Sequence, residues 1–451
     1  MYTPTRQQTD QLARDARALL ETLCRQPSIA AQGIGIAEMA DLVEGELRET
    51  GFATRRFSVK GAPPIVYGEL PGGPTTILLY DHYDVQPPEP LDLWDSEPFE
   101  PTVRDGKLYA RGTSDDKGEI AARLTAIRAL RRELGRLPVT LKYIIEGEEE
   151  IGSPHFDQII APHAKLLKAD GCLWEGAGFE PDGRLGLTLG SKGLLYVQLD
   201  VRCMARDAHS GGAAVLPSAA WRLVQALATL KTPAGKVRIP GFYDAVKPPS
   251  AAQLQAMREQ PDTDAEIKAA YGVERFIDDL HGFALRKRGS FAPTCNIAGL
   301  ESGYTGQGSK TVLPAAAMCK IDFRLVPDQD PDDILAKLKR HLADQGYGDI
   351  EVSVFSHARP IVTPVDDPFA QRVARIAEAF AGKPPSISPI SPGTLPLLAS
   401  LEKRVGVPGL SAPGDPVYWA NGAHSPNEHI RLDDLRQAVA FNTHLFQALG
   451  E

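Results

Sequence analysis

The chain is poor in cysteine. Its 451 residues include five cysteines, and no two of them form a C-x-x-C pair. They are Cys24, Cys172, Cys203, Cys295 and Cys319. Their odd number and wide spacing predict buried free thiols in a reducing compartment, the cytoplasm, and argue against disulfides. The same spacing argues against a thiolate metal site, so the ligands of any bound metal should be histidines and carboxylates.

Long apolar runs are missing too. No stretch of about 18 apolar residues occurs, which excludes a transmembrane helix. Residues 1–8 lead into a charged amphipathic segment and not into an apolar signal core. Acidic residues outnumber basic ones, 58 to 49, and the formal net charge is −9. This balance predicts that neither nucleic acid nor a membrane is a main partner.

Two common catalytic and binding signatures are absent. The chain has no G-x-S-x-G, which argues against a hydrolase of the serine-elbow type. Segment 303–311 is similar to a phosphate-binding loop, but Ser309 displaces Lys310 by one position. Pro314 also prevents the helix that such a loop must open. We therefore do not expect nucleotide binding.

Apolar periodicity predicts a mixture of helices and strands. Helical spacing predicts helices over 10–25, 36–50, 119–134, 218–230, 331–345 and 433–449. Alternating or continuous apolar runs predict strands over 52–59, 65–69, 77–81, 139–145, 171–174, 194–201 and 318–325. Residues 232–290 are rich in proline, glycine and charge.

The length of the chain exceeds what one core supports, so two domains are expected. Residues 193–357 carry their own α+β pattern, which predicts a unit inserted into a first domain made of 1–192 and 358–451. Gly193 and the neighbourhood of Pro360 are the expected hinges.

The first candidate site residues follow the strand 77–81. His82 and Asp84 stand two residues apart in extended chain, so both side chains point to the same side. The carboxyl ends of core strands are where open α/β sheets bind ligands. His82 could bind a metal through one ring nitrogen while Asp84 accepts the N–H of the other, which fixes the tautomer. Alone, an H-x-D pair is a weak signal.

Two acidic segments strengthen the prediction of a metal site. Asp115 and Asp116 lie between glycines just before the helix 119–134, where Asp115 could bind a metal or simply cap the helix. The run 146–153 places four carboxylates within five residues after a core strand. Such a run repels itself unless cations hold it, although a solvated acidic loop is the alternative.

Two further candidates lie later in the chain. Glu175 ends the predicted strand 171–174, and His424 stands in a loop before the last helix. Oxygen and imidazole ligands without thiolates suit zinc, manganese or cobalt.

These motifs resemble those of the M20 metallopeptidase family over essentially the whole chain. The resemblance rests on His82-x-Asp84, Gly112-Thr113-Ser114-Asp115-Asp116-Lys117-Gly118, Glu146-Gly147-Glu148-Glu149-Glu150-Ile151-Gly152-Ser153 and Gly422-Ala423-His424-Ser425-Pro426-Asn427-Glu428, in this order and spacing. It implies an α/β fold, namely a three-layer catalytic domain of the di-zinc exopeptidase type with an inserted α+β lid that also dimerises. The family contains dipeptidases, carboxypeptidases and deacylases of N-acyl amino acids.

The resemblance also implies two divalent metal ions per chain, usually zinc, with manganese or cobalt possible. One ion would take His82, Asp115 and Glu175, and the other would take Asp115, Glu150 and His424, so that Asp115 bridges them. Asp84 would orient His82. Glu149 would be the general base on a metal-bridging water.

Further roles are implied for the insert and for a late loop. His209 resembles the residue that stabilises the oxyanion, often across a homodimer. Thr311 and Arg324 resemble residues that bind the carboxylate of the substrate, and Gly393 and Thr394 resemble a loop that contacts the same end of it.

The substrate class stays open at this point. The segment 80–87 looks most like the dipeptidase branch, which implies hydrolysis of dipeptides or short peptides with a free carboxylate. Glu175 departs from that branch, which commonly has Asp there, and favours a deacylase or carboxypeptidase. A non-catalytic binding protein with the same fold is the remaining alternative.

Overall fold

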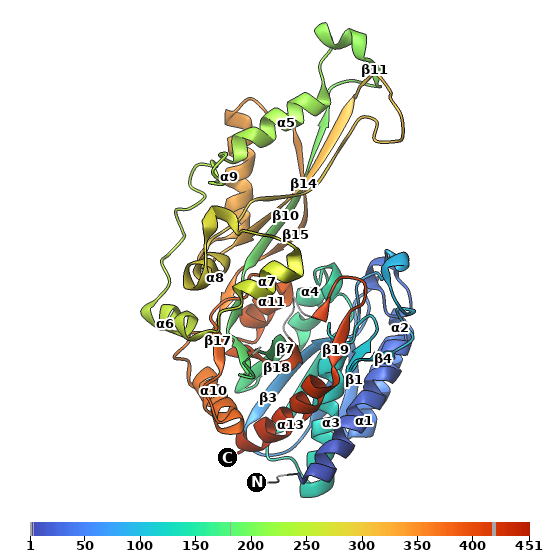
Figure 1. The fold of residues 1–451 in the computed structure, drawn as a ribbon, viewed down its shortest axis with the longest axis vertical. Helices are drawn as coiled ribbons and strands as arrows, with labels where there is room; N and C mark the ends of the chain where they lie inside the picture. Colours follow the sequence, from blue (N-terminus) through green and yellow to red (C-terminus); the bar gives the residue numbers. More distant parts are fainter. Residues whose placement is uncertain (1, 3, 181, 417–420) are drawn as a thin grey trace.

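The computed structural model describes residues 2, 4–180, 182–416 and 421–451. An eight-stranded mixed sheet forms the base of the molecule, and a four-stranded antiparallel sheet projects from it (Figure 1). Each of the helices and strands predicted from the sequence is present, with its ends shifted by a few residues. No helix among the described residues is long and apolar enough to cross a membrane.

The larger sheet has the strand order β1-β2-β6-β3-β7-β18-β8-β17. Its strands are β1 (Ala53–Phe57), β2 (Ile65–Leu70), β3 (Thr76–His82), β6 (Thr140–Glu146), β7 (Gly171–Phe179), β8 (Gly186–Thr188), β17 (Ser386–Ser388) and β18 (Gly409–Pro416). β3 runs parallel to both of its neighbours, β6 and β7. Its continuous apolar run suits this central place, because a parallel sheet is covered on both faces.

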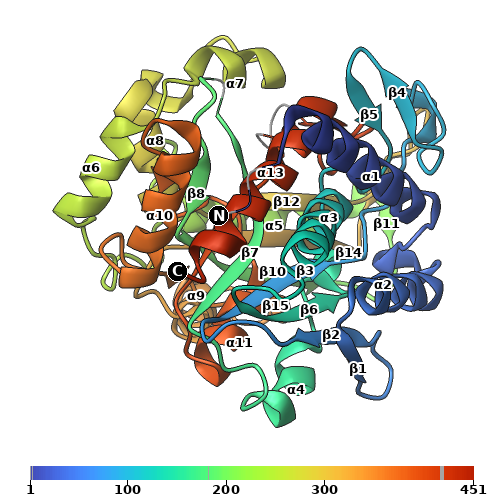
Figure 2. The same cartoon turned by 90° about the horizontal axis from the view of Figure 1, so that it is seen from below.

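Helices cover both faces of this sheet (Figure 2). α1 (Arg6–Arg25), α3 (Lys117–Leu134) and α13 (Leu432–Ala448) contact one another on one side. α4 (Phe156–Ile160) and α11 (Pro396–Arg404) lie on the other side. α2 (Ile36–Thr50) contacts α1 and α3, and α10 (Pro368–Ala381) contacts α13. As expected from the sequence, Gly51 ends α2 in the left-handed conformation, with φ of 99°.

The smaller sheet has the order β12-β14-β10-β15 and its own hydrophobic core. Its strands are β10 (Gly193–Arg202), β12 (Asn296–Ser302), β14 (Ala316–Leu325) and β15 (Glu351–Ala358). Buried residues alternate along β10 and β14, so one face is apolar. α5 (Ala219–Leu230) and α9 (Pro331–Asp344) supply the rest of that core.

The segment from 232 to 292 is rich in proline, glycine and charge, and it still forms regular structure. It contains three helices, α6 (Ala251–Glu259), α7 (Asp264–Tyr271) and α8 (Gly282–Phe291). α6 contacts β17 of the larger sheet, and Gln260 Nε2 donates to Ile387 O at 2.8 Å. This part of the insert therefore folds back onto the larger sheet.

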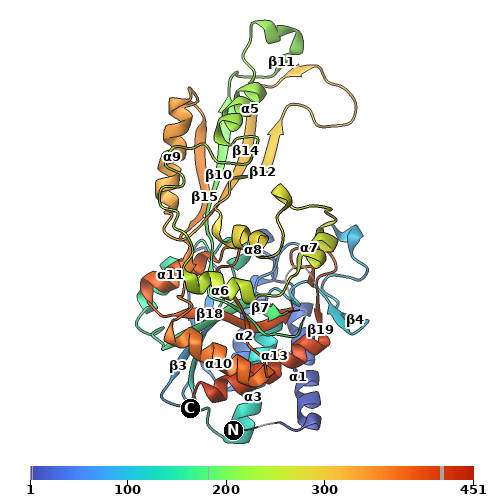
Figure 3. The same cartoon turned by 60° about the vertical axis from the view of Figure 1, so that its left-hand side comes forward.

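Two short chain crossings connect the sheets (Figure 3). β9 (Gly190–Ser191) pairs with β16 (Ile361–Val362), and Leu194 pairs with Ala358 just beyond. A Cβ at Gly193 would lie 2.7 Å from Ala358 O, so the crossings touch and only glycine fits there. The remaining short strands are β4 (Thr102–Arg104), β5 (Lys107–Tyr109), β11 (Ala208–His209), β13 (Val312–Leu313) and β19 (His429–Arg431).

Candidate metal centre and catalytic site

His82 is the last residue of β3, and its imidazole is fully buried. Its Nδ1 lies 3.0 Å from the backbone oxygen of Asp84 and 3.4 Å from Asp84 Oδ1. The carboxylate of Asp84 accepts hydrogen bonds from the backbone N–H groups of Glu149 (3.2 Å) and Glu150 (3.0 Å). The imidazole of His82 therefore lies closer to the carbonyl of Asp84 than to its carboxylate, and the carboxylate bonds to the backbone of the acidic turn.

Asp115 lies between two histidines. Its Oδ1 is 2.9 Å from His82 Nε2, and its Oδ2 is 3.0 Å from His424 Nε2. Asp116, not Asp115, occupies the N-cap position of α3, and its side chain makes no capping bond. The structure therefore places Asp115 in a bridging position and not in a capping one.

The loop before Asp115 is held by Glu428, which is fully buried. The Glu428 carboxylate accepts hydrogen bonds from the backbone N–H groups of Gly112 (3.0 Å), Ser114 (2.9 Å) and Asp115 (3.1 Å). Arg111 neutralises it at 2.7 Å. Because Glu428 follows His424 by four residues, this contact ties the bridging aspartate to the histidine loop.

Glu150 completes the second group of candidate ligands. Its Oε2 lies 3.1 Å from His424 Nε2 and accepts a hydrogen bond from Gln86 Nε2 at 2.9 Å. Gln86 also donates to the backbone oxygen of Glu150. The acidic run is therefore an organised turn and not a solvated loop.

Glu175 completes the first group, with its Oε2 at 3.1 Å from His82 Nε2. It lies within β7, which continues to Phe179, so the prediction that the strand ends here was wrong. β18 extends the ladder past this point through a register shift. Asp116 also has an oxygen near His82 and Glu175, but its Oδ2 accepts the backbone N–H of His82 at 3.1 Å.

The two groups fit metal ions by their chemistry. Each histidine presents Nε2 to carboxylate oxygens about 3 Å away, close to the spacing around an ion with ligands at about 2.0–2.2 Å. His82 and Glu175 could hold one ion with either Asp115 or Asp116, and Asp115, Glu150 and His424 could hold the other.

Electrostatics point the same way. Burial raises the pKa of Glu150 to about 7, and the nearby Asp115 adds to this. Burial alone would lower the pKa of His424, but its contacts with Asp115 and Glu150 raise it to about 11. Such shifts mark a buried excess of negative charge, which a divalent cation would relieve.

Glu149 begins a short 3-10 turn, Glu149–Ile151, beside these groups. Burial, and then the charge of Glu175, holds the pKa of Glu149 well above its usual range. Glu149 belongs to neither candidate ligand group. Its neighbour Glu148 faces away to His155, whose Nδ1 lies 3.0 Å from both carboxylate oxygens.

Three of the four predicted substrate-binding residues form a second cluster. Arg324 stands near the base of β14 and donates from NH1 to Thr394 Oγ1 at 2.8 Å. The backbone N–H of Lys192 donates to Gly393 O at 3.0 Å, which holds the loop of Thr394. Burial, and then the charge of Arg324, lowers the pKa of the Lys192 ammonium to about 8. The structure thus brings Arg324, Gly393 and Thr394 together.

His209 and Thr311 lie elsewhere. They stand on or beside the small β11–β13 pair at the far end of the smaller sheet, away from β3 and β7 (Figure 1). Thr311 Oγ1 is 3.4 Å from His209 Nε2, and both residues are exposed. Within one chain, the structure does not bring this pair to the candidate metal ligands.

Comparison with known proteins identifies the family. The sequence model of peptidase family M20/M25/M40 matches residues 78–448. The chain belongs to this family. As an M20 member it is a peptidase-type hydrolase, and the resemblance noted in the sequence is confirmed.

Similar M20 proteins are dipeptidases by name. The chain is 29% identical over 427 residues to a Cys-Gly metallodipeptidase of Candida albicans, which covers 88% of this chain and 86% of the relative. It is 30% identical over 384 residues to the Beta-Ala-His dipeptidase of Mus musculus, with 82% and 76% covered.

Solved M20 structures confirm the expected α/β fold. An M20 family metallo-carboxypeptidase from Sulfolobus solfataricus superposes with a TM-score of 0.91 at 35% identity, covering 97% of this chain and 99% of that one. Human carnosine dipeptidase 1 superposes with a TM-score of 0.84 at 25% identity and covers 98% of both chains.

Three residues near the M20 centre received no role from the sequence. Gln86 and Glu428 lie inside the motifs, and their positions two residues after Asp84 and four after His424 could have suggested a supporting role. Lys192 gave no such signal, because a lysine in a polar turn is usually exposed.

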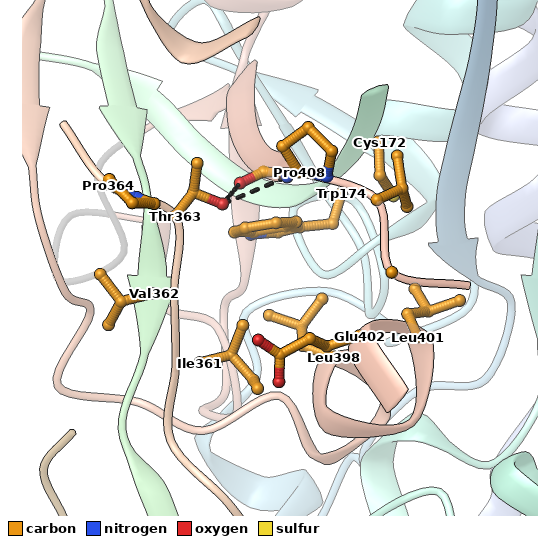
Figure 4. Close-up of a pocket in the computed structure, with 13 residues that line it drawn as sticks. Cys172, Trp174, Ile361, Val362, Thr363, Pro364, Leu398, Leu401, Glu402 and Pro408 are labelled. Atoms are coloured by element: carbon orange, nitrogen blue, oxygen red, sulfur yellow. Dashed lines mark hydrogen bonds between the residues drawn. The ribbon is translucent and has the colours of Figure 1, made fainter. Parts of the chain in front are cut away.

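A separate cavity of about 280 Å³ lies beside β7 (Figure 4). Apolar side chains dominate its wall, among them Trp174, Ile361 and Leu398, with Glu402 as the acidic residue. Two hydrogen bonds between Thr363 Oγ1 and the backbone of Gly409 close one side. None of the described residues that line it belongs to the candidate ligand groups, so this cavity is not the metal centre.

Proposed function

We propose that the protein is a di-metal-dependent dipeptidase or carboxypeptidase that cleaves short peptides with a free C-terminal carboxylate. The convergence of His82 and His424 on the two oxygens of Asp115 carries this proposal. The Arg324–Thr394 pair offers a carboxylate site with a planar guanidinium. The names of the relatives point to the same substrates.

We infer two zinc ions per chain, with manganese or cobalt as alternatives, because nitrogen and oxygen ligands serve all three. When bound, the ions would lower the pKa of a water and polarise the scissile carbonyl. Glu149 would accept the proton of that water and deliver it to the leaving amine.

We propose that residues 193–357 act as a lid and dimerisation domain between the catalytic segments 1–192 and 358–451. β12 is an edge strand, and Ile297 (51%) and Leu300 (55%) on it are exposed. Trp221 on α5 is 67% exposed. A homodimer would cover this edge and bring His209 and Thr311 of the partner subunit to the centre. Five free thiols fit a cytoplasmic location.

Mixing two inactive variants tests the shared site. Glu149→Gln and His209→Ala homodimers should each be nearly inactive, but mixed dimers would keep one site with both residues intact. Random exchange should then restore about a quarter of wild-type turnover. If His209 acts within its own chain, or if no dimer forms, the mixture stays as inactive as its components.

A substrate panel tests the reaction class. Metal-loaded enzyme should hydrolyse dipeptides, and an amidated C-terminus should abolish binding because Arg324 then has no carboxylate to pair with. Glu175, which fits a carboxypeptidase and a deacylase alike, keeps a second candidate open, a deacylase of N-acyl amino acids such as acetylornithine or succinyl-diaminopimelate. Turnover of only the acylated compounds would establish that alternative.

A further inference from the structure

One helix side chain bonds to two strands that carry metal-ligand candidates. Arg123, on α3, is 2% exposed. Its NH1 donates to the backbone oxygen of Tyr80 on β3 at 2.8 Å, and its NH2 donates to the backbone oxygen of Trp174 on β7 at 3.0 Å. His82 lies two residues after Tyr80, and Glu175 directly follows Trp174.

The guanidinium of Arg123 lies at the point where the direct pairing between β3 and β7 ends. The register of β3 and β7 runs from Ile77 opposite Gly171 to Leu79 opposite Leu173. At the next residue pair, the guanidinium takes the place of direct pairing between Tyr80 and Trp174. The planar guanidinium of arginine donates in fixed directions, so it holds the two carbonyl oxygens at a fixed separation. The flexible side chain of a lysine would not do this.

Glu119, one helical turn earlier on α3, extends the same support. Its Oε2 lies 2.7 Å from Arg123 NH2, and its Oε1 accepts the backbone N–H of Gly176 at 2.8 Å. Gly176 follows Glu175, so the chain on both sides of this ligand is tied to α3. Asp81, beside His82, also pairs with Arg123.

The Glu150–His424 half of the centre has a support of its own in Gln86, whereas Asp84 contacts both halves. Gln86 holds the carboxylate of Glu150, and Asp84 holds the backbone of the acidic turn. Among the described residues, neither of these supports contacts Arg123 or Glu119 through a hydrogen bond.

We propose that Arg123 and Glu119 are positioning residues that set the spacing and affinity of the His82–Glu175 half of the centre alone, while Gln86 sets the Glu150–His424 half. The proposal rests on the two-ion function proposed above. Supports of this kind typically change metal affinity by about 10–100-fold.

The test measures metal occupancy at each position separately. Metal-free wild type, Arg123→Lys and Gln86→Met are equilibrated with limiting buffered Zn²⁺, and anomalous diffraction gives the occupancy of each half. Arg123→Lys should weaken the His82–Glu175 half by about 10–100-fold and leave the other half nearly unchanged. Gln86→Met, the matched control, should show the reverse.

Measurements of variant stability and of metal binding by wild type distinguish the possible reasons for a negative result. Circular dichroism and the Tm of the metal-free variants report any general damage, and the near-isosteric Glu119→Gln replaces Arg123→Lys if that variant does not fold. Equal losses in both halves, or none, would overturn the positioning role. Wild type that binds only one ion at saturating Zn²⁺ would instead overturn the proposed two-ion function.

Discussion

Replacing Glu149 by glutamine is expected to remove most of the turnover and leave both metal ions bound. Glu149 lies beside the candidate ligands but belongs to neither group. Burial, and then the charge of Glu175, holds its pKa well above the usual range. General acid–base catalysis contributes about 10²–10⁴-fold, and a neutral amide accepts no proton, so kcat should fall by about that factor.

The measurement combines kcat with elemental analysis of the same sample. Glu148→Gln is the matched control, because Glu148 is the preceding residue and faces His155 instead of the centre. Its kcat should stay close to that of wild type. Metal loss in Glu149→Gln, together with lost turnover in Glu148→Gln, would show that the register of the acidic run is shifted by one residue.

Removing Asp115 should have the larger effect on metal content. Its two carboxylate oxygens face His82 and His424 separately, so Asp115→Ala takes a ligand from both positions at once. Elemental analysis should find about two ions per chain in wild type and close to none in the variant. A neutral methyl group also leaves the buried His82 and the more exposed His424 without their shared anionic partner.

Asp116→Asn is the control for the loss of metal that we expect in Asp115→Ala. Its amide oxygen can still accept the backbone N–H of His82, so this variant should retain most of its metal. Asp116 also stands near His82 and Glu175, which makes the comparison decisive. Greater metal loss in Asp116→Asn than in Asp115→Ala would make Asp116 the ligand, and loss of a single ion in Asp115→Ala would refute the bridge.

Strong periodic patterns allowed much of the fold to be predicted. β3 and β6 are buried apolar runs, and α2 and α13 have a clear apolar face, so local sequence and burial agree. α6 and α8 were missed because neither has a sharply apolar face. Ser250 caps α6, and the segment packs onto the larger sheet through α6. Such packing depends on residues far away in the sequence, so a local sequence pattern does not reveal it.

The candidate ligands could be predicted because they occur in short motifs. Their supports could not be predicted, because they act through the backbone of distant residues. Arg123 is separated from Trp174 by 51 positions and Glu428 from Ser114 by 314, so only the fold reveals these contacts. Asp84 illustrates the same point, since its carboxylate holds the turn at Glu149 and not primarily the neighbouring imidazole.

The paired crossings at β9 and β16 have a consequence for how such a chain can be built. In an antiparallel pair, opposite residues lie about 4.5–5.5 Å apart, a distance that a two-residue turn spans. The entry and exit of the inserted unit therefore coincide with the two arms of an ordinary hairpin. A gene could gain or lose the whole insert at this one point without breaking the eight-stranded sheet, and a protein engineer could excise it with the same cut.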